Sequence, residues 1–154
     1  MIMASKVKLT FRGFDLLLEQ IKDAGGEIKP ATERALLSSA HLLTQEIKTG
    51  AQQRGVPTDT LITPNVKWNG NRASVEVGFE LGAYDPRNPS SGYLALFKEY
   101  GAPSKGGTRK TSKGYNRGAV AADPFIRPAL KDNKKKIHAA QKKALERILG
   151  GLEQ

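Results

Sequence analysis

The sequence contains no cysteine and only two histidines, and these shortages exclude several kinds of chemistry. Without thiols there is no disulfide framework, no thiolate nucleophile and no CxxC-type metal site. The carboxylates are scattered singly and show neither an HExxH nor a DxD spacing. Because an active site needs converging groups with tuned protonation, we expect no enzyme activity, no cofactor and no metal site.

Long apolar runs are also missing. No segment approaches the roughly 18 consecutive apolar residues that a membrane-spanning helix needs, and residues 1–14 lack the apolar core of a signal peptide. We therefore expect a protein that is neither secreted by the usual signal nor membrane-spanning. The length of 154 residues predicts one domain, residues 1–154. The mean hydropathy of -0.46 predicts that its core is modest.

Positive charge, in contrast, is abundant. The chain has 25 lysines and arginines against 15 acidic residues, and its net charge is +10. Such an excess favours phosphate-rich partners, because cations that approach a polyanion release its counterions. The alternative is a solvated basic surface without a dedicated ligand.

One strand and two helices are predicted in the first third of the chain. Residues 6–12 alternate between apolar and polar side chains, as a half-buried strand does. Apolar residues at helical spacing then predict a short helix that ends at Gly25-Gly26. A longer helix is predicted from Pro30 to about Gln53, with one apolar face made by Leu36, Ala40, Leu43, Ile47 and Ala51.

A hairpin is predicted around Asn69-Gly70-Asn71, which separates two alternating runs. Whether the loop is Asn69-Gly70 or Gly70-Asn71, the pairing places the same apolar side chains on one face: Val66, Trp68, Ala73, Val75, Val77 and Phe79. The core face of the hairpin is therefore predicted for either register.

The segment from Tyr93 to Tyr100 is apolar except for Lys98 and Glu99, which predicts a short helix that is buried or docked on a partner. For Glu99 three arrangements are open: solvation beside Lys98, pairing with an arginine such as Arg127, or a charged contact across a subunit boundary.

A long flexible loop is predicted over about residues 102–122, because glycines and cations fill it and bulky aliphatic residues are missing. Its candidate contacts for an anion or DNA are Lys105, Arg109, Lys110, Lys113 and Arg117. The loop has one aromatic residue, Tyr115, whereas a protein that binds single-stranded nucleic acid stacks successive bases on several aromatic side chains. This shortage favours protein partners for the positive charge of the loop.

After the loop, Asp123 is predicted to cap a turn that starts at Pro124. A longer helix is predicted from about Pro128 to a frayed end at Gly150-Gly151. The segregated strands and helices indicate an α+β domain, in which a small antiparallel sheet of about three strands packs against amphipathic helices.

Two motifs in this order resemble the tail-component family of long-tailed bacteriophages and prophages. The first motif is the aromatic-rich segment Tyr93–Gly101, which ends in Glu-Tyr-Gly. The second is Asp123–Leu130, which reads Asp-Pro-Phe-Ile-Arg-Pro-Ala-Leu. Thr58-Asp59-Thr60-Leu61 stands where the family has Thr-Gly-x-Leu, and the long amphipathic helix is also present.

The resemblance implies a structural virion protein, a tail-completion or head–tail joining component of the neck that forms an oligomeric ring without catalysis. It implies a place in the virion neck or tail, assembly in the bacterial cytoplasm, and connector, tail-tube or terminator proteins as partners. The residues expected at a subunit or partner interface are Tyr93, Phe97, Glu99, Tyr100, Gly101, Pro124, Phe125, Arg127 and Pro128. The alternative function, which rests on the net charge and the clustered lysines, is a basic nucleic-acid-binding module.

Overall fold

The computed structural model describes residues 5–85, 87–101 and 121–153, and its sheet has three antiparallel strands in the order β1-β3-β2. These strands are β1 (Lys6–Thr10), β2 (Val66–Asn69) and β3 (Arg72–Gly78). Asn69 pairs with Arg72, so the hairpin loop is Gly70-Asn71, and Gly70 has the positive φ that the first position of a type II′ turn requires. The predicted core face of the hairpin is confirmed, because Val66 lies opposite Val75 and Trp68 opposite Ala73.

Helix α2 (Ile28–Gln53) packs its predicted apolar face on the sheet. All five predicted side chains of this face are fully buried: Leu36, Ala40, Leu43, Ile47 and Ala51. Together with Val75, Val77 and Phe79 they form the main hydrophobic core, which also includes Phe125 and Ile126 from the second motif. Burial of these side chains stabilises the fold by roughly 1.5 to 3 kcal/mol for each large aliphatic or aromatic residue.

A second core lies on the opposite side of α2, where it meets α1 (Asp15–Asp23) and α5 (Lys134–Leu152). Small residues of α2, Ala31 and Ala35, allow the close approach of Ile21 and Leu145. The buried Gln141 side chain donates to Oγ of Ser39 at 3.1 Å, so this helix contact also contains one satisfied polar pair. Helix α2 is therefore buried on two sides.

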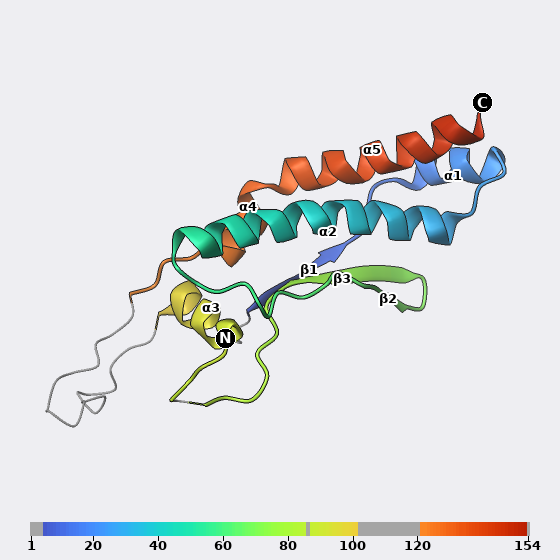
Figure 1. The fold of residues 1–154 in the computed structure, drawn as a ribbon. Coiled ribbons are helices and arrows are strands. Elements are labelled where there is room, and N and C mark those ends of the chain that lie inside the picture. Colours follow the sequence, from blue (N-terminus) through green and yellow to red (C-terminus); the bar gives the residue numbers. More distant parts are fainter. Residues whose placement is uncertain (1–4, 86, 102–120, 154) are drawn as a thin grey trace, which may run out of the picture.

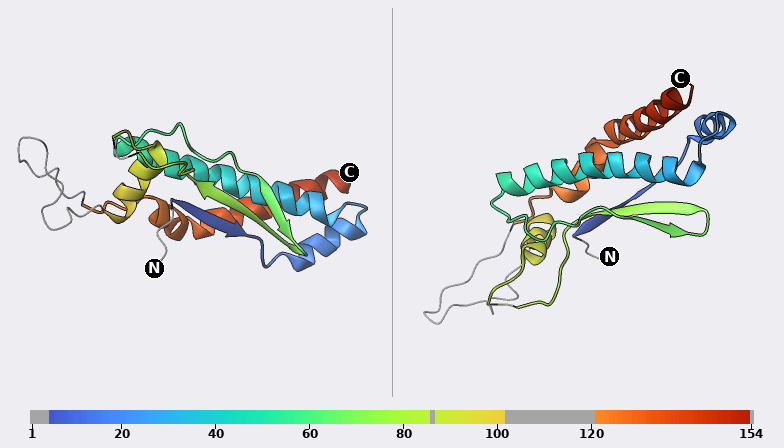
Figure 2. Two further views of the ribbon diagram at one scale, coloured as in Figure 1. Left: turned by 90° about the horizontal axis from the view of Figure 1, so that it is seen from below. Right: turned by 45° about the vertical axis from the view of Figure 1, so that its right-hand side comes forward.

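The elements are arranged in layers, with α2 between the sheet below it and α1 and α5 above it (Figure 1). Further views show all of these helices on one side of the sheet, while its other face is turned away from them (Figure 2). The predicted α+β class is thus confirmed. Within the described residues, no helix is both long enough and apolar enough to cross a bilayer.

The end of the chain differs from the prediction. Helix α4 (Ile126–Asp132) begins two residues after Pro124, and the long helix α5 begins at Lys134, six residues after Pro128. The break comes at Asn133, whose side-chain amide donates to the Ala129 carbonyl at 2.8 Å and so competes with the helical backbone. The helix does not fray at Gly150-Gly151 but continues to Leu152.

Candidate subunit and partner interface

The two motifs meet at the carboxylate of Glu99, near the end of helix α3 (Ser91–Tyr100). The backbone N–H groups of Phe125 and Ile126 each donate to Oε1 of Glu99 at 2.7 Å, and that of Arg127 donates to Oε2 at 3.1 Å. The carboxylate thereby satisfies the first free N–H groups of α4, which has no side-chain cap of its own. The prediction that Asp123 caps this segment is wrong, because Glu99, 27 positions before Ile126, caps the helix.

Arg127 completes this contact with its side chain. Its Nε donates to Oε2 of Glu99 at 2.7 Å, and its Nη2 donates to the Glu99 carbonyl oxygen at 3.1 Å. The guanidinium also lies over the ring of Tyr100, 4.3 Å from the ring centre. Of the arrangements open for Glu99, solvation beside Lys98 is wrong and pairing with Arg127 is confirmed.

The electrostatics of Glu99 balance two opposed effects. Its side chain is fully buried, and this burial alone raises the pKa of the carboxyl group. The hydrogen bond from Arg127 and those from the backbone N–H groups of Ile126, Phe125 and Arg127 together outweigh burial, so the pKa lies below its usual value of 4.5. Glu99 is therefore a buried, ionised carboxylate held by donors of its own chain.

A second connection joins the start of the second motif to α2 and α3. Nη2 of Arg54 donates to the Asp123 carboxylate at 3.1 Å, and Nη1 donates to the Gly50 carbonyl at 3.0 Å. The backbone N–H of Asp123 donates to the Lys98 carbonyl at 2.7 Å. Phe125 then packs against Gly50, which has no side chain to obstruct the ring. Arg54 was not among the predicted site residues, because nothing near it in the sequence marks a partner.

The third element of the family resemblance, Thr58–Leu61, is also part of this end of the molecule. The hydroxyl group of Ser91 at the start of α3 hydrogen-bonds with the Thr60 hydroxyl and accepts from the Thr60 backbone N–H at 3.2 Å. Leu61 forms an isolated bridge with Phe79 beside β3. Asp59 stands where the family has glycine, and like every described non-glycine residue it has a negative φ, so the turn accepts this residue without strain.

An aromatic cluster covers the outward side of α3. The rings of Tyr84 and Tyr93 lie 4.8 Å apart between centres, and Phe97 lies 6.3 Å from each of them. Tyr84 comes from the loop before α3 and remains 51% exposed, whereas Tyr93 and Phe97 are half-buried. We call these three residues the α3 aromatic surface.

The structure thus separates the predicted interface residues into two groups. Glu99 and Phe125 are buried within the chain, where they hold the motifs together. The others are partly or largely accessible: Tyr93, Phe97, Tyr100, Gly101, Pro124, Arg127 and Pro128. The predicted loop contacts Lys105, Arg109, Lys110, Lys113 and Arg117 lie outside the described residues.

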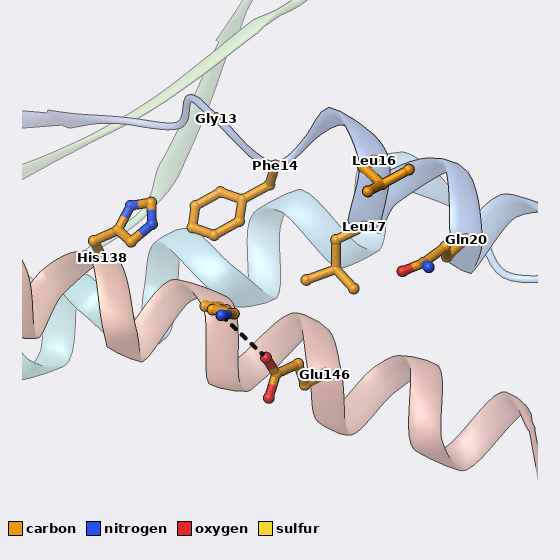
Figure 3. A pocket seen from close by; sticks show the side chains of 8 residues that line it. Gly13, Phe14, Leu16, Leu17, Gln20, His138 and Glu146 are labelled. Carbon is orange, nitrogen blue, oxygen red and sulfur yellow. Dashed lines mark ion pairs between the residues drawn. The ribbon is translucent and has the colours of Figure 1, made fainter.

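A hollow of about 400 Å³ lies between α1 and α5, on the helical side of the molecule (Figure 3). Leu17 of α1 and Phe14, the residue before α1, line this hollow. The ring of His138 stacks on Phe14 with 4.6 Å between the ring centres. Lys142 and Glu146 form an ion pair of 3.9 Å along α5. No group of three or more acidic or histidine side chains that could hold a metal occurs in the described part of the chain.

Comparison with known proteins adds no assignment. The chain matches no family model, no curated protein and no solved structure.

Proposed function

We propose that this chain is a structural assembly protein of a bacteriophage or prophage, a tail-completion or head–tail joining component that forms an oligomeric ring in the virion neck. The observation that carries the proposal is the joining of the two family-like motifs through Glu99. Segments on both sides of residues 102–120 are held as one unit, beside the α3 aromatic surface. That unit is a rigid base for a contact with another subunit.

A ring that closes head to tail needs two different surfaces on each subunit. Helix α3, which carries the α3 aromatic surface, lies near the C-terminal end of α2, whereas α1 lies near its N-terminal end (Figure 1). The hollow beside α1 is bordered by Leu16, whose side chain is 71% exposed. These two uneven, partly apolar surfaces support a heterologous contact better than a two-fold symmetric one.

Assembly tests the proposal directly. The full chain, purified alone and mixed with phage connector and tail-tube proteins, is examined by light scattering and electron microscopy. We expect rings or a stable complex with one of these partners. Deletion of the gene from the phage or prophage should abolish infectious tailed particles, and the wild-type gene should restore them. A protein that stays monomeric, binds neither partner and is dispensable for infectious particles would contradict the proposal.

A further inference from the structure

Cations gather on the face of the sheet that the helices leave open. Strand alternation turns Val7 and Leu9 toward the core and Lys6 and Lys8 away from it. Lys67 in β2 and Arg72 in β3 also point away from the core. Arg12 follows β1 and is exposed beside them. We call this surface, made by Lys6, Lys8, Arg12, Lys67 and Arg72, the basic sheet face.

The register brings hydroxyl groups into the middle of these cations. Ser74 lies opposite Thr10 on one side and opposite Lys67 on the other. A hollow of about 310 Å³ opens at this point. Its polar lining consists of Lys8, Arg12 and Arg72 with Thr10, Asn69 and Ser74, and no carboxylate lines it.

Two carboxylates act on Lys6 of this face, Glu76 through an ion pair and Glu80 through its charge. Glu76 pairs with Lys6 at 2.9 Å, and the pKa of Glu76 is lowered by this hydrogen bond and by the charges of Lys67 and Lys8. Among the described residues, Lys8, Arg12, Lys67 and Arg72 have no acidic partner within 4 Å. Like charges that converge without a counterion favour the binding of a polyanion.

The chemistry of the lining indicates which polyanion. Two guanidinium groups, an ammonium group and neutral hydroxyl and amide donors suit phosphate oxygens, which accept several hydrogen bonds at once. The outward positions of the strands carry no aromatic side chain on which unpaired bases would stack. β3 spans about 20 Å, enough for several phosphates of a duplex with one charge per about 1.7 Å.

We infer that the basic sheet face binds the phosphate backbone of double-stranded DNA without reading its sequence, with Lys8, Arg12 and Arg72 as principal contacts. The lysines of α5 lie along an exposed helix, and the hollow of about 400 Å³ beside this helix is lined by one of them, Lys142, together with the carboxylate of Glu146 and no hydroxyl group. Duplex binding by this face would hold whether or not the chain assembles into a virion.

The test measures binding of two fluorescent 30-base-pair duplexes of unrelated sequence over a range of salt concentrations. We expect equal affinity for both and a linear fall of log affinity with log salt. The triple variant Lys8→Gln, Arg12→Gln, Arg72→Gln should have a shallower slope, by about 0.9 for each lost phosphate contact. The matched variant Lys135→Gln, Lys136→Gln, Lys143→Gln removes the same charge from exposed positions of α5 and should keep the wild-type slope.

Three results would overturn the inference. If the sheet variant keeps the wild-type slope, the contacts lie elsewhere. If the α5 variant loses as much of the slope as the sheet variant, binding follows net charge alone. If polyglutamate binds more tightly than DNA, the face is a site for an acidic protein. Circular dichroism and the oligomeric mass of both variants separate these results from a failure to fold or to assemble.

Discussion

At the scale of single residues, Glu99 is the group on which the junction of the two motifs depends. Its carboxylate accepts four hydrogen bonds, three from backbone N–H groups and one from Arg127. A buried ionised group with this many donors stabilises the fold only as long as every donor remains engaged.

The substitution Glu99→Gln tests this dependence. A neutral amide has one acceptor oxygen and brings two N–H groups toward three backbone donors, so we expect a loss of about 1.5 to 3 kcal/mol in the free energy of unfolding. Chemical denaturation measures the change. Glu46→Gln removes the same charge from an exposed position of α2 and should change the stability little. Equal stability of the Glu99 variant and the wild type would contradict the role of the carboxylate.

The lowered pKa of Glu99 also predicts how stability depends on pH. Between the lowered folded pKa and the unfolded value near 4.5, the unfolded chain binds more protons than the folded one. The contribution of Glu99 is therefore fully present above pH 4.5 and is lost as the pH falls through the folded pKa. Denaturation midpoints measured from pH 6 to pH 3 should fall more steeply for the wild type than for Glu99→Gln. Parallel curves would show that Glu99 has the same pKa in the folded and unfolded chains and would contradict the lowered pKa.

At the scale of elements, the position of α3 depends on a close approach of two backbones. A Cβ built on Gly92 would overlap the carbonyl oxygen of Glu80 and lie 2.8 Å from its carbonyl carbon. Neither atom belongs to a flexible side chain, so the helix has to move if a side chain is added. Glycine at position 92 therefore allows α3 to pack against the backbone of Glu80, just after β3.

Substitution of two helical glycines should change stability in opposite directions. Gly92→Ala forces α3 away from Glu80, and we expect it to destabilise the protein by about 1 to 3 kcal/mol or more. Gly150→Ala lies in α5 with open space around its Cβ and should stabilise the protein by up to about 1 kcal/mol. Thermal unfolding of both variants distinguishes the close contact from the general helix preference for alanine. A Gly92→Ala variant that is more stable than the wild type would refute the close contact between α3 and Glu80.

At the scale of the whole molecule, two features lie at different ends of the sheet. Helix α3, which carries the α3 aromatic surface, lies against Glu80 after the end of β3, whereas the hollow of the basic sheet face lies at Asn69 and Arg72 beside the hairpin loop (Figure 2). In the proposed ring, the α3 aromatic surface and the surface beside α1 would contact neighbouring subunits, and the basic sheet face would contact DNA.

The exposure of Tyr84 gives a test of the proposed assembly contact. Tyr84→Ser removes a ring that is 51% exposed, and we expect weaker oligomers with an unchanged unfolding midpoint of the monomer. His41→Ser, which changes an exposed side chain in the middle of α2, serves as the control and should assemble as the wild type does. Sedimentation over a concentration series measures both. Oligomers of equal strength in the two variants would place the contact elsewhere.

The sequence by itself determined the parts of the fold that depend on local periodicity. The apolar faces of β3 and α2 and the hairpin at Gly70 follow from side-chain alternation, helical spacing and turn chemistry, which act over a few residues. The short helix over Tyr93–Tyr100 was predicted for the same reason and begins two residues earlier in the structure.

Only the tertiary structure decided which distant groups meet. Glu99 caps α4 in place of Asp123, Arg54 binds Asp123, and Arg12 comes beside Arg72 across the sheet. Each of these contacts joins segments separated by more than 20 residues, so its formation depends on how the elements pack and not on the spacing of residues along the chain. The Glu99 carboxylate was visible in the sequence, but the four donors that hold it ionised were assembled by the fold.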